Sequence, residues 1–265
     1  MDNRPIGVMD SGVGGLSVVQ VLKQQLPNET IIFVGDQGHF PYGTRDTANI
    51  QQLALSIGEF FKSQDVKLTV IACNTATAAA LEILQERMPF PVIGVIEPGA
   101  KAALSLPQHH MIGVIATEST TESDAYPKQI RKLDPNCIVI SKAAQPLVSI
   151  VEHGLTDSPQ AQTTVDQELA PFKTSNITSL ILGCTHFPFL SSQINHFFNN
   201  RVTLVDPAEE TVKTVQQQLI TNHQLSDQAY GKLTLYSTGD GTALAAAVKK
   251  WLTTADESNC CHLDL

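Results

Sequence analysis

The chain has few basic residues and no long apolar run. Its 17 Lys and Arg residues stand against 26 Asp and Glu, and the formal net charge is −9. Nucleic-acid binding needs clustered basic side chains that displace counterions from phosphates, and here basic residues occur at most in pairs such as Arg131-Lys132. No stretch approaches the ~18 consecutive apolar residues that span a bilayer. The sequence therefore predicts a protein that binds neither nucleic acid nor membrane.

Paired cysteine motifs are also missing. The five cysteines are an odd number without a Cys-x-x-Cys spacing, and the first residues do not resemble a signal peptide. We therefore expect free thiols in a reducing compartment, the cytoplasm. Cys184 and His186 lack further metal ligands at usable spacing, so no metal site is predicted. A phosphate-binding loop is absent, and no lysine is placed for a Schiff base, so we expect no cofactor.

Short β-branched runs alternate with longer helical stretches along the whole chain. This alternation is typical of parallel strands joined by helices, and it predicts an α/β fold. The expected strands cover residues 6–9, 31–34, 68–72, 92–95, 111–115, 137–141, 179–182, 202–205 and 233–236.

The two halves of this pattern resemble each other. Ile6-Gly7-Val8 recurs as Ile112-Gly113-Val114, and a second strand, a cysteine and a fourth strand follow in the same order at similar spacing. We expect two similar α/β domains, each a mainly parallel sheet flanked by helices. The first would comprise residues 1–97 plus 208–265, and the second residues 98–207.

Three further expectations concern the connections of these domains. The chain should break and restart at Glu97-Pro98-Gly99, where it enters the second domain. The final strand and helix, residues 232–254, should return to the first domain. Residues 255–265, including Cys260-Cys261, are expected to be a frayed tail rather than a metal or redox site.

Cys73 and Cys184 each follow an apolar strand at equivalent places in the two halves. Ligands of open α/β sheets bind beyond the carboxyl ends of the strands. A thiol at a helix N-terminus, as predicted for Cys73, can have a pKa well below its free value. A single cysteine there is more often a small buried hydrophobe, as expected for Cys137, but two equivalent cysteines favour function.

A glycine-rich loop, Asp-Ser-Gly-Val-Gly-Gly at residues 10–15, follows the first strand. It resembles a dinucleotide fingerprint, with Asp36 near the place of a ribose-binding acid. The third glycine of that fingerprint is replaced by Ser17, however. Asp10 would also bring an anion toward the pyrophosphate, and it suits an ammonium group or a thiol better.

Two other regions carry candidate residues. The loop after the second strand is rich in turn formers, and Tyr42 with the Gly43 backbone could close over a small ligand. His186 adjoins a candidate thiol, which favours a functional role. Glu152 ends a helical run, where a solvated helix end is the simpler interpretation.

With these motifs the chain resembles the glutamate racemases of the aspartate/glutamate racemase family over nearly its full length. The resemblance rests on DSGVGG (10–15), FPYG (40–43), ACNTATA (72–78), GCTHFP (183–188) and VDPAE (205–209). It implies a cofactor-independent amino-acid racemase that supplies D-glutamate for bacterial peptidoglycan. It also implies a substrate site between two pseudo-symmetric domains, often in a homodimer.

The resemblance also assigns roles to individual residues. It implies that Cys73 and Cys184 are the acid–base pair, that Cys73 acts on the D-form, and that Cys184 acts on the L-form. Asp10, Glu152 and His186 would assist them. The implied substrate-binding residues are Asp10, Ser11, Pro41, Tyr42, Gly43, Asn74, Thr75, Thr117, Thr185 and His186.

Racemisation removes a proton from one face of a carbon and returns one to the other, which suits two opposed thiols of near-neutral pKa. Two alternatives remain open from the residues alone. One is a related racemase or isomerase acting on aspartate, hydantoin or maleate. The other is a nucleotide-binding α/β module whose cysteines are structural.

Overall fold

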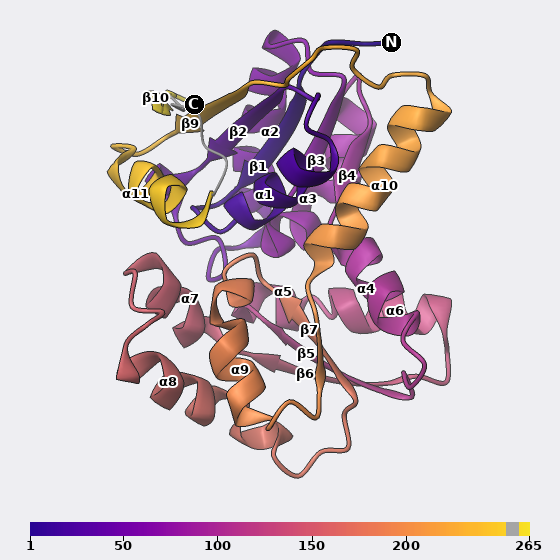
Figure 1. Cartoon of the computed structure of the whole chain (residues 1–265), viewed down its shortest axis with the longest axis vertical. Coiled ribbons are helices and arrows are strands. Elements are labelled where there is room, and N and C mark those ends of the chain that lie inside the picture. Colours follow the sequence, from indigo (N-terminus) through magenta and orange to yellow (C-terminus); the bar gives the residue numbers. More distant parts are fainter. Residues whose placement is uncertain (253–259) are drawn as a thin grey trace.

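A computed structural model describes residues 1–252 and 260–265 of the chain. Two parallel β-sheets, each covered by helices on both faces, form two lobes (Figure 1). The first lobe contains a six-stranded sheet and both termini, and the second contains a four-stranded sheet. These two lobes confirm the α/β fold class, while the exact domain bounds stay a prediction.

The strands are short and mostly buried, as expected for parallel sheets covered on both faces. The first sheet contains β1 (Ile6–Asp10), β2 (Ile31–Gly35), β3 (Leu68–Ile71), β4 (Val92–Gly94), β9 (Leu233–Ser237) and β10 (Cys260–His262). The second contains β5 (Met111–Ala116), β6 (Ile138–Ala143), β7 (Ser179–Gly183) and β8 (Thr203–Val205). All nine strands expected from the sequence are present, with ends shifted by one or two residues.

Helices on the two faces of each sheet complete its cores. In the first lobe, α1 (Leu16–Gln25), α10 (Pro207–Thr221) and α11 (Thr242–Trp251) pack on one face, and α2 (Thr47–Ser63) and α3 (Asn74–Arg87) on the other. In the second, α7 (Gln145–Glu152), α8 (Pro159–Leu169) and α9 (Ser191–Phe197) face α4 (Ile96–Leu104) and α6 (Ala125–Leu133) across the sheet. Short connecting elements are η1 (Gln37–His39), α5 (Glu118–Glu122), η2 (Ala170–Phe172) and η3 (Phe187–Leu190).

The strand orders of the two sheets match. The strand order of the second sheet is β6-β5-β7-β8. The first sheet contains the corresponding order β2-β1-β3-β4, and its two further strands, β9 and β10, continue the sheet beyond β2. Ile6 pairs with Ile31 and Leu68 of its neighbours, as Ile112 pairs with Val139 and Ser179. The internal duplication predicted from the repeated text is therefore visible as one topology built twice. β9 pairs with β2, so the last long strand returns to the first sheet as expected.

Two details of the sequence-based prediction are wrong. Glu97, Pro98 and Gly99 do not break the chain but lie inside α4, because a proline in the first turn of a helix costs no intrahelical hydrogen bond. Cys260 and Cys261 do not fray: they form β10, whose backbone pairs in parallel with the exposed edge of β9. The part of the expected tail at 255–259 lies outside the described residues.

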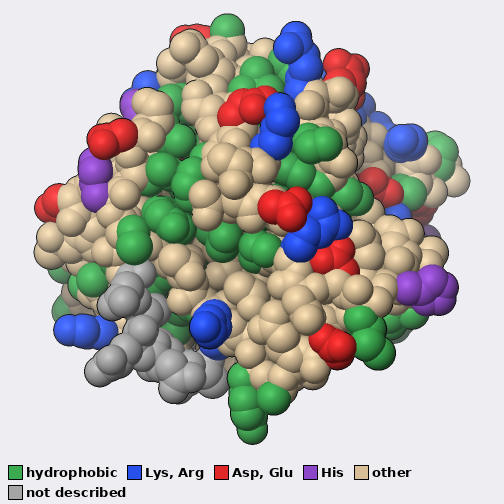
Figure 2. Space-filling view, turned by 90° about the horizontal axis from the view of Figure 1, so that it is seen from above, with side chains coloured by type: hydrophobic (Ala, Val, Ile, Leu, Met, Phe, Trp, Pro, Cys, Tyr) green, Lys and Arg blue, Asp and Glu red, His purple; other side chains and the backbone are tan. Residues whose placement is uncertain are grey.

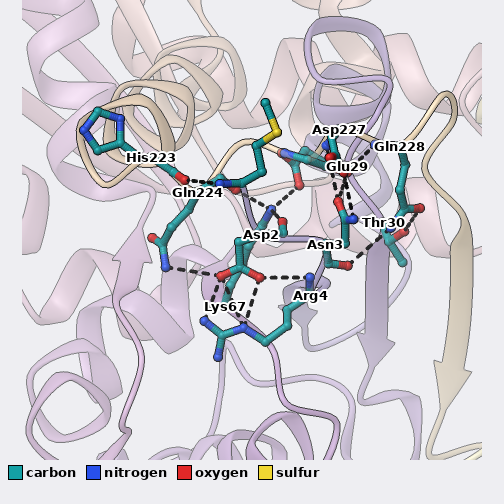
Figure 3. A network of polar contacts seen from close by, with 12 residues as sticks. Asp2, Asn3, Arg4, Glu29, Thr30, Lys67, His223, Gln224, Asp227 and Gln228 are labelled. Carbon is teal, nitrogen blue, oxygen red and sulfur yellow. Dashed lines mark hydrogen bonds and ion pairs between the residues drawn. The ribbon is translucent and has the colours of Figure 1, made fainter.

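A buried ion pair holds the end of the first sheet that lies away from the cysteines (Figure 3). Lys67 and Glu29, which precede β3 and β2, are 2.5 Å apart and almost fully buried. Lys67 Nζ also donates to the carbonyl oxygens of Asp2 and Gln224, at 2.6 and 2.8 Å. The N-terminal segment and the loop after α10 are thereby held together at this end of the sheet (Figure 3).

Charged side chains of both signs share the visible surface (Figure 2). On the face shown in Figure 2, acidic and basic side chains are interspersed among apolar and neutral ones. Within residues 1–252 and 260–265, no helix combines the length and apolar character that crossing a membrane requires.

Candidate active site

The two cysteines meet at one cavity between the lobes. Cys73 follows β3 and Cys184 follows β7, which are corresponding strands of the two sheets. The cavity is small, about 10 Å³. Its lining comprises Ser11, Phe40, Pro41, Tyr42, Gly43, Cys73, Asn74, Thr75, Thr117, Gln145, Val148, Cys184, Thr185 and His186. A wider groove of about 960 Å³ lies between α2, α3 and the C-terminal residues, but it contains neither a cysteine nor a histidine.

Cys73 is the N-cap of α3. Its sulfur accepts from the Ala76 backbone N–H at 3.4 Å and lies 3.6 Å from Ser11 Oγ. The sequence suggested that this position would lower the thiol pKa, but the prediction is wrong. Burial, helped by the nearby Asp10, raises the pKa of Cys73 to about 12 and outweighs the hydrogen bonds from Ala76 and Ser11. The thiol is therefore protonated at neutral pH.

Cys184 has different surroundings. No α-helix begins directly after it: Thr185 and His186 lead into the short η3 turn. Its sulfur lies 3.4 Å from His186 Nδ1, and His186 Nε2 lies 2.5 Å from Glu152 Oε1. The three side chains form the chain of contacts that activates thiol groups in many enzymes, in which a base is oriented by a carboxylate.

The charges of His186 and Glu152 stabilise each other. Burial alone would lower the pKa of His186, but Cys184 and Glu152 raise it well above its usual value. Burial likewise acts to raise the pKa of Glu152, yet the hydrogen bond and charge of His186 make the net shift downward. A protonated His186 beside an ionised Glu152 is the state that these shifts favour, and it places a positive charge next to the sulfur of Cys184.

Asp10 connects the two half-sites. It is fully buried at the end of β1, where its carboxylate accepts from the Gly12 N–H at 3.1 Å and from Thr185 Oγ1 at 3.2 Å. Burial raises its pKa, against the effects of His186 and of the loop N–H groups. The carboxylate of the first lobe is thus bonded to the residue that follows Cys184 in the second.

The glycines of the 10–15 loop make room for the other lobe. A Cβ on Gly14 would lie 2.4 Å from Thr185 Oγ1 and 2.8 Å from His186 Nδ1, and one on Gly12 would lie 2.7 Å from Glu152 Oε1. The space that a dinucleotide fingerprint leaves for a pyrophosphate is therefore filled by protein side chains. This geometry argues against the nucleotide-binding alternative.

Asp36 is also engaged within the protein. Its carboxylate accepts from the Tyr42 hydroxyl at 2.5 Å and from Thr238 Oγ1 at 2.6 Å, and it lies 2.8 Å from His39 Nδ1. It is fully buried, so it holds the Tyr42 loop against the sheet rather than presenting an acid to a ribose. The expected closing loop after β2 is thereby anchored beside the cavity, and the Ser119 N–H of the second lobe bonds to the Gly43 carbonyl oxygen at 2.9 Å.

Polar side chains from both lobes meet at the cavity wall and directly behind it. Thr75 Oγ1 of α3 lies 2.9 Å from Thr117 Oγ1 and 3.2 Å from Thr120 Oγ1. Asn74 accepts a hydrogen bond of 2.7 Å from the Tyr126 hydroxyl. All five side chains are buried.

Every residue proposed from the sequence lies at or directly behind the cavity. Asp10 and Glu152 stand behind the lining and contact it through Thr185 and His186. Sequence reasoning missed Phe40, Thr120, Tyr126, Gln145 and Val148, which contribute to the lining or support it. Phe40 begins the FPYG motif and Gln145 closely follows a strand, and such positions could have indicated residues of the site. Tyr126 lies inside a helical segment, where its sequence neighbours give no such indication.

Comparison with known proteins places the chain. The profile of the Asp/Glu/Hydantoin racemase family matches residues 6–215. The "Glutamate racemase" of Limosilactobacillus reuteri is 57% identical over 100% of this chain and 98% of its own length. The crystal structure of the glutamate racemase isoform RacE1 from Bacillus anthracis has a TM-score of 0.95 at 38% identity, covering 100% of this chain and 99% of that one.

A second solved structure is nearly as similar. The glutamate racemase of Francisella tularensis, crystallised in complex with D-glutamate, has a TM-score of 0.92 at 37% identity and covers 100% of this chain and 98% of that one. Fold, site and full-length similarity together define an isomerase. The chain belongs to the Asp/Glu/hydantoin racemase family.

Proposed function

We propose that the chain is a glutamate racemase that interconverts L- and D-glutamate, with Cys73 and Cys184 as its two acid–base groups. The observation that carries the proposal is the placement of two thiols, from corresponding strand ends of two matching sheets, on one cavity. The names of the similar proteins and the D-glutamate bound to one of them support the choice of substrate.

The reaction needs one thiolate and one thiol. The thiolate takes the α-proton from one face of the substrate, and the electron pair of the broken C–H bond stays on the α-carbon. The thiol on the opposite face then donates its proton to that carbon and becomes the thiolate. Each turnover thus reverses the roles of the two sulfurs, and the return reaction uses the same groups in the opposite order.

Ionisation of the thiols depends on their surroundings. Cys73 is protonated before substrate binds, because burial raises its pKa to about 12. The α-ammonium group of an amino acid brings a positive charge into the cavity and favours the thiolate. On the other side, the protonated His186 supplies positive charge next to Cys184.

The carbanion formed next to a carboxylate requires hydrogen-bond donors fixed in place before reaction. The hydroxyls of Ser11, Thr75, Thr117 and Thr185 and the amide of Asn74 line the cavity and are suited to bind the substrate carboxylates. Pro41, Tyr42 and Gly43 complete the wall on the side of the first lobe. The lining comes from both lobes, so a substrate held between them would be shielded from bulk water, which strengthens these interactions.

The biological setting follows from the family resemblance. We propose that the enzyme acts in the cytoplasm, that it supplies D-glutamate for peptidoglycan, and that it works as a homodimer. We also propose that it needs no cofactor, because the two thiols can carry both proton transfers.

A racemase assay tests the proposed function directly. Purified protein, dialysed against EDTA and without added pyridoxal phosphate or nucleotide, should convert either enantiomer of glutamate to the racemate. L-aspartate serves as the comparison substrate and should react at least about tenfold more slowly, because a side chain one methylene shorter fits the same contacts less well. Faster turnover of aspartate, or activity only after a cofactor is restored, would contradict the proposal.

A further inference from the structure

Tyr126 is a buried tyrosine that does not line the cavity yet bonds to a residue that does. It lies at the start of α6 in the second lobe and is 1% exposed. Its hydroxyl donates to Asn74 Oδ1 at 2.7 Å. Asn74, 4% exposed, is the first residue of α3, directly follows Cys73, and lines the cavity.

The phenol ring occupies a slot that two glycines leave open. A Cβ on Gly183, the last residue before Cys184, would lie 2.9 Å from Tyr126 Cε2. A Cβ on Gly99 of α4 would lie 3.1 Å from the Tyr126 hydroxyl oxygen. Tyr126 is thus fixed against the strand that carries one thiol, and its hydroxyl reaches the residue beside the other.

The hydroxyl of Tyr126 is a permanent donor. Burial, together with the nearby Asp206 and Cys184, raises its pKa well above the usual value, so the phenol keeps its proton. A side-chain amide has an acceptor oxygen on one branch and a donor nitrogen on the other. A donor that holds Oδ1 on one side therefore leaves the Nδ2 hydrogens as the group that Asn74 can offer to the cavity.

We infer that Tyr126 is a positioning residue that fixes the Asn74 amide with its nitrogen toward the cavity, as a donor for a carboxylate oxygen of the substrate. This inference rests on the proposed racemase function. Without the tyrosine hydroxyl the amide can turn over, and its oxygen would then face the substrate carboxylate and repel it. Since Tyr126 and Asn74 belong to different lobes, the Asn74 amide is held in this orientation only when the two lobes are in contact.

A double-mutant cycle tests this inference. Tyr126→Phe keeps the ring between the two glycines and removes only the hydroxyl. We expect KM for both glutamate enantiomers to rise about tenfold, with a smaller change in kcat. In the Asn74→Ala background, the same change at Tyr126 should have no further effect, because the group that it orients is gone.

Tyr236→Phe is the matched control. Tyr236 lies on β9, packs against Phe60 and does not line the cavity, so the loss of its hydroxyl should leave kcat and KM unchanged. Far-UV circular dichroism and thermal melting of each variant monitor the fold. A merely structural Tyr126 would reduce activity by the same factor in both Asn74 backgrounds, which would overturn the inference.

The remaining outcomes separate the two claims. Wild-type kinetics in Tyr126→Phe, with an active wild-type enzyme, would overturn the inference and leave the proposed function intact. A wild-type protein that does not racemise glutamate would overturn the proposed function, and the inference would fall with it.

Discussion

The two half-sites occupy equivalent places in matching sheets, yet their chemistry differs. Cys73 caps an α-helix and contacts a backbone N–H and a serine hydroxyl, whereas Cys184 contacts a histidine that is bonded to a glutamate. Burial and the nearby carboxylate of Asp10 therefore dominate at Cys73, whereas Cys184 has the positively charged His186 beside it. Duplication of a fold placed two thiols symmetrically, but the residues around each thiol determine how it becomes ionised.

The carboxylate of Asp10 connects the two half-sites. Asp10 belongs to the first lobe but bonds to Thr185, the neighbour of Cys184, and the glycines beside Asp10 admit His186 and Glu152. The polar side chains of the second half-site thus pack against the loop at residues 10–15 of the first lobe. Changes at Gly12 or Gly14 should damage the Cys184 side, while the contacts of Cys73 with Ser11 and Ala76 remain.

Among substitutions outside the two cysteines, Gly14→Ala should have the largest effect on activity. The new methyl group would lie 2.4 Å from Thr185 Oγ1, so Thr185 and His186 must move. We expect kcat/KM to fall about 100-fold, because displacing a catalytic group by about 1 Å has effects of that size. Steady-state racemisation measures the change.

Gly239→Ala is the control for this substitution, because its added Cβ would have no described neighbour nearer than 3.3 Å. It should retain wild-type kinetics. Wild-type activity in Gly14→Ala would show that the close approach of the two lobes is not needed for catalysis.

A smaller effect should follow from Glu152→Gln, which keeps a hydrogen-bond partner for His186 but removes the charge. The pKa of His186 should fall, and the Cys184 thiolate should lose part of its stabilisation. We expect kcat/KM to fall about tenfold, or ~1.4 kcal/mol.

The two reaction directions then provide a sharper comparison. Because enantiomers have equal free energy, kcat/KM must fall equally in both directions, but kcat and KM need not change equally. The ratio of the two kcat values should differ from that of the wild type. An unchanged ratio would mean that Glu152 serves both half-sites alike.

A separate effect concerns stability at alkaline pH rather than catalysis. The pKa of Cys73 is raised from 9.0 to about 12 in the folded state, so its contribution to stability is complete below about pH 9 and is lost as pH rises toward 12. The loss amounts to about 1.4 kcal/mol per pH unit in that window. Urea unfolding of wild type and Cys73→Ser at pH 8 and pH 10.5 should show a steeper decline for the wild type. Parallel declines would show that the thiol pKa is not raised.

Much of this architecture could be predicted from the sequence, because its signals are local. The β-branched run before Cys73 and the repeated Ile-Gly-Val text indicate strands and a duplicated sheet, and both are present. The cysteine motifs at strand ends likewise bring the two thiols to one edge. The strand and motif positions thus required no knowledge of long-range packing.

Long-range contacts account for what the sequence did not reveal. The Glu152 side chain, at an unremarkable helix end, joins the candidate site only through its contact with His186. Tyr126 meets Asn74 across the lobes, and the pKa of Cys73 depends on burial that its helix position does not indicate. β10 forms because the edge of β9 can accept a further strand, and the three residues of β10 give no local sequence signal for this pairing.

Exchange of the α-hydrogen in deuterium oxide with single cysteine variants tests the two-thiol claim most directly. Cys184→Ala should exchange the α-hydrogen of D-glutamate alone, Cys73→Ala that of L-glutamate alone, and neither should racemise, with losses of at least about 1,000-fold. Exchange of both enantiomers, or near-normal racemisation, in either variant would contradict the assignment of one sulfur to each face.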